Sequence, residues 1–132
     1  MDSSRPFNIM VVDDNSANLR LLSAAFMEAG YRVRAALNGQ TALRSAKIAP
    51  PDLILLDVRM PFMNGYQVCE LLKADDALRH IPVVLISALN SDSERRRGIA
   101  AGAAGFICKP FVLDNILDIV ALHLIRGPIQ VE

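Results

Sequence analysis

The stretch that decides the fold is Leu53-Ile54-Leu55-Leu56-Asp57-Val58-Arg59-Met60-Pro61. Four aliphatic residues in a row, then an acid and then a proline, indicate a short strand that is buried on both faces and ends at a turn. The same organisation recurs at Ile9-Met10-Val11-Val12 before Asp13-Asp14, and at Val83-Val84-Leu85-Ile86 before Ser87. Strands of this kind are typical of parallel sheets that helices cover on both sides.

Two further runs indicate the edges of the same sheet. Residues 31–36 alternate apolar residues with Arg32 and Arg34, and Phe106-Ile107-Cys108 is short. Apolar residues at helical spacing fill the intervening segments, which predicts helices near 19–29, 42–48 and 66–74, after Ser91, and over 112–126. Ser91 and Glu94 predict a capping box at the start of the fourth helix. The fold class is therefore α/β, a single (βα)5 doubly wound parallel sheet, and the strand order 2-1-3-4-5, which places the second and fifth strands at the edges, fits this pattern.

Length and composition limit the classes of protein. The chain has 132 residues, 52% of them hydrophobic and 21% charged, which suits one ordinary domain over 1–132 with a core of about 8–126 and short ends. Its 14 basic and 14 acidic residues balance, which argues against nucleic acid or an anionic membrane as a partner. No apolar run has the length of a membrane span or a signal-peptide core, and Cys69 and Cys108 suggest no disulfide framework. We expect a cytoplasmic protein.

Polar residues follow the strands of this sheet at their carboxyl ends, where ligands of open α/β sheets bind. We expect Asp13, Asp14 and Asp57 to crowd together, with Ser87 and Lys109 opposite. Three carboxylates repel one another and require a cation, and oxygen ligands favour Mg²⁺. The lysine and the hydroxyl suit phosphoryl oxygens, and the natural nucleophile is a carboxylate that would form an aspartyl phosphate.

The chain resembles the receiver domain of bacterial two-component response regulators and hybrid histidine kinases, over roughly residues 8–126. The resemblance rests on five motifs in order: Val12-Asp13-Asp14-Asn15, Leu56 to Pro61 with Asn64-Gly65, Ile86-Ser87-Ala88, Gly102-Ala103, and Phe106-Ile107-Cys108-Lys109-Pro110. Each motif is weak alone, but their order at the ends of successive strands is highly specific. The fold it implies is the flavodoxin-like receiver fold.

The resemblance implies a role for each site residue. Asp57 would be the phosphoacceptor, and the ligands of Mg²⁺, or of Mn²⁺ in its place, would be Asp13 through water, Asp14, Asp57 and the backbone carbonyl of Arg59. Ser87 and Lys109 would bind the phosphoryl group. A cis Lys109-Pro110 peptide is predicted from the resemblance and from the need for the lysine to turn back over the strand edge.

Two further roles concern the response to phosphorylation. Phe106 would be the aromatic switch that turns inward, although the family more often has Tyr at this position; a core aromatic is the alternative. Arg59 and Leu89 border the path of the attacking water in the family. We expect them to set the lifetime of the phosphorylated state, with Leu89 hindering water.

The function implied is a phosphorelay switch, phosphorylated by a histidine kinase or phosphotransfer protein, which is no turnover enzyme. The rivals are a Mg²⁺-dependent phosphohydrolase, for which the chain has no room for a cap, and an interaction module that takes no phosphate. The last helix carries Leu122 and Ile125 on its predicted outward stripe after Asp114 and Asp118. This predicts contact with a partner, a homodimer through helix 4, strand 5 and helix 5, or contact with the rest of a longer chain.

Overall fold

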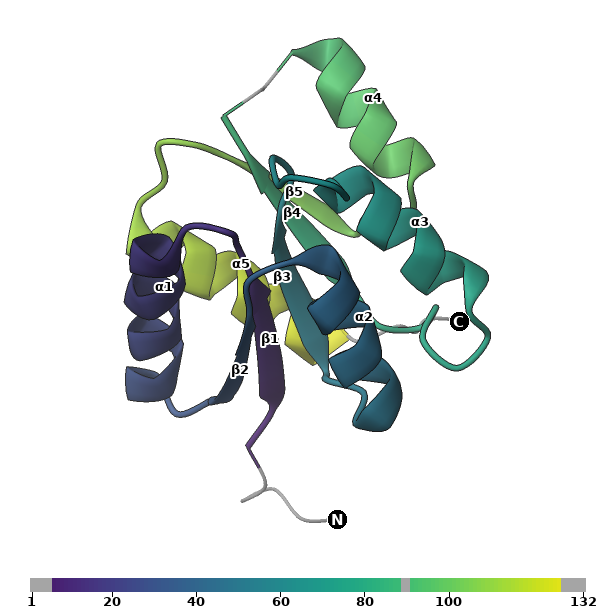
Figure 1. The fold of residues 1–132 in the computed structure, drawn as a ribbon. Helices are drawn as coiled ribbons and strands as arrows, with labels where there is room; N and C mark the ends of the chain where they lie inside the picture. Colours follow the sequence, from purple (N-terminus) through teal and green to yellow (C-terminus); the bar gives the residue numbers. More distant parts are fainter. Residues whose placement is uncertain (1–5, 89–90, 127–132) are drawn as a thin grey trace.

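The computed structural model describes residues 6–88 and 91–126, in which five strands alternate with five helices (Figure 1). The strands are β1 (Asn8–Val12), β2 (Arg32–Ala36), β3 (Leu53–Asp57), β4 (Val83–Ser87) and β5 (Gly105–Cys108). The helices are α1 (Ser16–Glu28), α2 (Gly39–Ile48), α3 (Gly65–Ala74), α4 (Asp92–Ala100) and α5 (Leu113–Arg126). Within the described ranges, no helix is both long enough and apolar enough to cross a membrane.

The five strands form one parallel sheet in the order β2-β1-β3-β4-β5, which confirms the predicted topology. The burial of each strand accounts for its pattern of apolar residues in the sequence. β3 and β4 are buried along their whole length and β1 nearly so, whereas the edge strands β2 and β5 are only partly buried. The register aligns Val12 of β1 with Leu56 of β3, so the residues that follow these two strands come to the same edge.

Two helical layers cover the sheet, α1 and α5 on one face and α2, α3 and α4 on the other (Figure 1). Side chains alternate between these layers along each strand because successive residues of a strand point to opposite faces. In β1, Ile9 and Val11 pack in the cluster that includes α1 and α5, whereas Met10 and Val12 pack in the cluster that includes α2 and α3. The sheet is therefore a rigid platform from which the carboxyl-end loops project.

Side-chain caps fix where the helices that border this edge begin. Asn15, Asn38, Asn64 and Ser91 each accept a hydrogen bond from a backbone N–H in the first turn of the following helix. The predicted capping box at Ser91 is wrong in its second half, because the Glu94 carboxylate accepts a hydrogen bond from the hydroxyl of Tyr66. The complete box lies at α3, between Asn64 and Gln67.

The loop between β3 and α3 contains a strained turn. The Met63 N–H donates to the Pro61 carbonyl at 2.7 Å, and Phe62 between them has a φ of 69°. This closes a γ-turn of the rare, strained kind, in the left-handed region that disfavours a residue with a Cβ. The Phe62 side chain is fully exposed, so no burial offsets the strain.

The substitution Phe62→Asn should raise the free energy of unfolding by about 1 kcal/mol, because Asn tolerates the left-handed region and no buried contact is lost. Urea denaturation of both proteins measures the change. The matched control is Phe62→Ala, which removes the same exposed ring and keeps a Cβ with no polar group; it should leave the stability within a few tenths of a kcal/mol. Equal effects of the two substitutions would contradict the assignment of strain.

Candidate functional site

Three carboxylates meet at the carboxyl edge of β1 and β3. Asp57 is the last residue of β3, and Asp13 and Asp14 directly follow β1, the neighbouring strand. One carboxylate oxygen from each of the three residues lies within 4.8 Å of the others. Asp13 and Asp57 are each only 4% exposed, whereas Asp14 is exposed and lines a hollow on the surface. The structure thus brings together the three acids that the strand order predicts.

Lys109 supplies the positive charge of the cluster. It directly follows β5, and its Nζ lies 2.8 Å from Oδ1 of Asp57. Its backbone N–H donates to the carbonyl of Ser87 at 2.7 Å, which fixes the chain beside the end of β4. The Lys109-Pro110 peptide is cis, as predicted. From this position the lysine side chain reaches past the end of β4 to the acid on β3.

Burial dominates the electrostatics of the two inner acids. It raises the pKa of Asp57 above its usual value, against the opposing effect of the hydrogen bond and charge of Lys109. Burial also raises the pKa of Asp13, although the backbone N–H of Asn15 donates to its Oδ1 at 2.9 Å and lowers it in part. Each pKa is raised because a buried carboxylate lacks the solvation that favours its charged form. One lysine does not neutralise three acids, so a further cation would relieve the repulsion.

The residues present fit a hard divalent cation. The ligand atoms available are carboxylate oxygens alone, which is the chemistry that Mg²⁺ and Mn²⁺ accept, and they lie close enough to share one ion. The backbone N–H of Arg59 hydrogen-bonds to the Asp57 carboxylate and helps to fix its orientation. Asp13, Asp14 and Asp57 are therefore the residues that would hold the metal.

The other predicted site residues lie on β4 and β5. Ser87 is buried at the end of β4, where it pairs in register with Cys108. Phe106 is half-buried on β5, and the Arg95 guanidinium lies 5.6 Å from its ring centroid. Leu89, predicted to tune the lifetime, lies outside the described residues.

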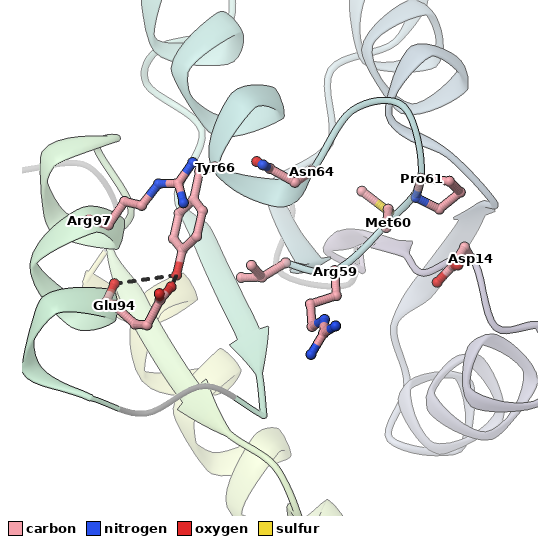
Figure 2. Close-up of a pocket in the computed structure, with 9 residues that line it drawn as sticks. Asp14, Arg59, Met60, Pro61, Asn64, Tyr66, Glu94 and Arg97 are labelled. Atoms are coloured by element: carbon pink, nitrogen blue, oxygen red, sulfur yellow. Dashed lines mark hydrogen bonds between the residues drawn. The ribbon is translucent and has the colours of Figure 1, made fainter.

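A hollow of about 460 Å³ adjoins the acidic cluster (Figure 2). Its lining comprises Asp14, Val58, Arg59, Met60, Pro61, Asn64, Tyr66, Glu94 and Arg97. The hollow joins the β1 and β3 ends to α4, so α4 forms part of the surroundings of the site. The sequence analysis named Asp14 and Arg59 but missed the group at the far side of the hollow.

That group is a polar contact between α3 and α4. The Tyr66 hydroxyl donates to the Glu94 carboxylate at 2.6 Å, and the Arg97 guanidinium lies 4.4 Å from the ring centroid, so both side chains converge on Tyr66 (Figure 2). Tyr66 itself is only 2% exposed. Because Gly98 is the one buried residue of α4, this helix depends on side-chain contacts rather than on an apolar face. The sequence signal for this contact was the spacing of Glu94 and Arg97, three residues apart on one helix. That spacing does not show which side chain of another helix they contact.

Comparison with known proteins gives one family. The family model described as "Response regulator receiver domain" matches residues 9–121. The chain is 34% identical over 119 residues to the polar-differentiation response regulator DivK of Brucella anthropi, which covers 90% of this chain and 97% of DivK. It is 49% identical over 109 residues to the response regulator PleD of Caulobacter vibrioides, covering 83% of this chain. The match spans only 24% of the length of PleD.

Solved structures show the same fold. The chemotaxis protein CheY4 of Vibrio cholerae superposes with a TM-score of 0.86 at 28% identity, covering 89% of this chain and 98% of CheY4. The receiver domain of the sensor histidine kinase PA1611 of Pseudomonas aeruginosa gives a TM-score of 0.85 at 28% identity, covering 92% of this chain and all of that domain. The PA1611 structure has a magnesium ion coordinated in its active-site cleft.

The contact at Tyr66 predicts a distinctive dependence of stability on pH. Burial, followed by the hydrogen bond to Glu94, raises the pKa of Tyr66 to about 12. The unfolded chain loses the same proton near pH 10. Between these values the unfolded state binds fewer protons, so the stability falls as the pH rises from about 10 to about 12.

The variant Tyr66→Phe should lose about 1 kcal/mol of unfolding free energy at neutral pH, since the hydrogen bond is removed. At alkaline pH it should not show the fall in stability that ionisation of Tyr66 causes in the parent. Urea denaturation of parent and variant from pH 7 to pH 11 checks both effects. The control is Tyr31→Phe, which keeps the edge-to-face ring contact with Phe26 and removes a hydroxyl elsewhere. Parallel pH profiles for parent and Tyr66→Phe would contradict the raised pKa of Tyr66, and equal stability at neutral pH would contradict the contribution of the hydrogen bond.

Proposed function

The chain belongs to the response regulator receiver domain family, and from this premise we propose that it is a phosphorelay switch whose phosphoacceptor is Asp57. The observation that carries the proposal is the buried Asp57 carboxylate, 2.8 Å from Lys109 and clustered with Asp13 and Asp14. A buried acid beside one lysine at the carboxyl edge of a parallel sheet supports a role as the nucleophile toward phosphorus. The donor is the phosphohistidine of a histidine kinase or phosphotransfer protein, and the protein works in the cytoplasm.

Each residue of the site has a task in this reaction. An Asp57 oxygen would form the new bond to phosphorus as the P–N bond of the donor's phosphohistidine breaks and its nitrogen keeps the electron pair, while Lys109 and Ser87 bind the phosphoryl oxygens. Asp13, Asp14 and Asp57 would hold Mg²⁺, or Mn²⁺ in its place, together with the backbone carbonyl of Arg59. When bound, the ion supplies positive charge that neutralises the carboxylates and the incoming phosphoryl group.

Phosphorylation would be read out through β5 and α4. Phe106 is the proposed switch, since its ring is half-buried beneath the Arg95 guanidinium and packs close to Gly98 of α4. Arg95 also donates to the Cys108 sulfur at 3.3 Å. An inward turn of Phe106 towards Ser87 would break the contact between Arg95 and the ring and shift the face formed by α4, β5 and α5.

Two rival functions are tested separately. A phosphohydrolase would turn over phosphate monoesters repeatedly, whereas the proposed switch transfers one phosphoryl group to itself and releases it slowly. An interaction module would bind partners without any labelling of Asp57. We propose Arg59 and Leu89 as the residues that set the lifetime of the label.

Acetyl phosphate with Mg²⁺ should add one phosphoryl group to the parent, and Asp57→Asn should abolish the gain, because the amide is no nucleophile. Intact-mass spectrometry measures both. Chelation of Mg²⁺ by EDTA should suppress labelling at least tenfold. The control is Asp52→Asn, an exposed acid just before β3 that should label like the parent. Undiminished labelling of Asp57→Asn would refute the assignment.

We also propose that phosphorylation promotes a homodimer through α4, β5 and α5. The α5 side chains Leu122 and Ile125 are exposed, at 48% and 80% of their surface, as the sequence predicted. In sedimentation experiments the phosphorylated parent should associate, and the double substitution Leu122→Glu/Ile125→Glu should weaken association at least tenfold. The control Leu71→Glu changes an equally exposed leucine on α3. If the phosphorylated and unphosphorylated proteins are both monomers, the homodimer is refuted and this face would have to bind a different partner.

A further inference from the structure

Phe62 has no explanation in the folding of the chain. Its backbone φ of 69° is unfavourable for a residue with a Cβ, and its ring lies wholly in solvent. An exposed aromatic ring contributes no burial to the fold, and Asn or Gly would adopt this turn with less strain. Strained residues of this kind concentrate at functional sites, which directs attention to what the ring could contact.

The turn holds the ring outward in a fixed position. The Gly65 N–H donates to the Val58 carbonyl at 2.8 Å and closes the base of the loop. The next residue, Met63, packs inward against Gly39 of α2. Its sulfur lies so close to this glycine that a Cβ at position 39 would be only 3.0 Å away. Because Met63 packs inward and the γ-turn is closed, the loop that exposes Phe62 to solvent is held in one conformation. Little conformational entropy is therefore lost when a partner binds Phe62.

The loop also lies at the rim of the acceptor site. It begins directly after Asp57, and Met60 and Pro61, the residues before Phe62, line the hollow that also contains Asp14 (Figure 2). Asp57 is buried, so a phosphohistidine reaches it only if the donor protein presses against the rim loops. Aromatic residues, Phe among them, are enriched in the cores of protein interfaces, so a fully exposed ring at such a rim is suited to contact a partner.

We propose that Phe62 anchors the protein that donates the phosphoryl group, by inserting its ring into an apolar depression beside the donor's phosphohistidine. This rests on the proposed function of Asp57. In the transfer, the P–N bond of phosphohistidine breaks as an Asp57 oxygen forms a P–O bond, and the leaving nitrogen keeps the electron pair. A donor is favoured over an output partner because Phe62 belongs to the loop that directly follows Asp57, whereas the proposed output face is formed by α4, β5 and α5.

The experiment compares a protein donor with a small donor on the same variants. The protein donors are the autophosphorylated cytoplasmic portions of the histidine kinases of the source organism, and the small donor is acetyl phosphate with Mg²⁺. Phe62→Asn should lower the second-order rate constant of transfer from the kinase that labels the parent at least tenfold, with labelling by acetyl phosphate changed less than twofold. Phe62→Trp, which keeps a large aromatic ring, should retain most of the transfer rate.

The matched control is Ile48→Asn, which removes an apolar residue that is 80% exposed at the end of α2, away from the site; its transfer rate should equal that of the parent. Unchanged transfer to Phe62→Asn, an equal loss in Ile48→Asn, or an equal loss with acetyl phosphate would each overturn the anchor. If acetyl phosphate labels the parent but no kinase does, the donor assignment is wrong. Failure of acetyl phosphate to label the parent would instead refute the proposed function itself.

Discussion

The contact between Lys109 Nζ and Asp57 Oδ1, at 2.8 Å, is the interaction on which the rest of the site depends. A buried carboxylate without a partner would be costly, so the position of the lysine decides whether Asp57 can remain ionised inside the protein. The lysine comes from the edge strand β5 and must reach past β4, which is possible only because β3, β4 and β5 are consecutive neighbours in one parallel sheet. The fold therefore serves the site mainly by fixing these three strand ends relative to one another.

The positive charge of Lys109 does not balance the negative charge of the carboxylates around it. Asp13 and Asp14 add two more carboxylates within 4.8 Å, and burial raises the pKa of Asp13 as well as that of Asp57. The cluster thus favours any positive charge that enters, whether a divalent ion or a proton. Under the proposed function, an ion held by the three acids would supply positive charge and so lower the repulsion that an anionic phosphoryl group meets at this edge.

Much of the fold was accessible from the sequence, since unbroken aliphatic runs identify the buried strands and the alternating run at 31–36 identifies an edge. Topology then placed Asp13, Asp14, Asp57 and Lys109 together, because parallel strands deliver their carboxyl ends to one edge. The contacts between helices were not accessible. The Tyr66 hydroxyl and the Glu94 carboxylate are 28 positions apart in the chain, and their meeting depends on how α4 lies against α3. For the same reason the second half of the predicted capping box was wrong: Ser91 caps the helix, but the Tyr66 hydroxyl holds the Glu94 carboxylate that would have returned to Ser91.

The departures from local stability gather at one edge of the molecule. The hollow beside Asp57 is lined by Asp14, by the two residues before the left-handed Phe62 and by charged side chains of the polar helix α4, whereas the two apolar clusters lie within the sheet and its helix layers. A sequence selected for stability alone would have neutral residues in place of the acids and Asn or Gly in place of Phe62. It would also cover Tyr66 with apolar residues of α4 instead of charged ones. Because the central strands β1, β3 and β4 are buried and paired on both sides, the sheet tolerates this cost without losing its register. The structure thus separates a stable platform from a strained, charged rim, and the residues of the proposed chemistry at Asp57 lie at that rim.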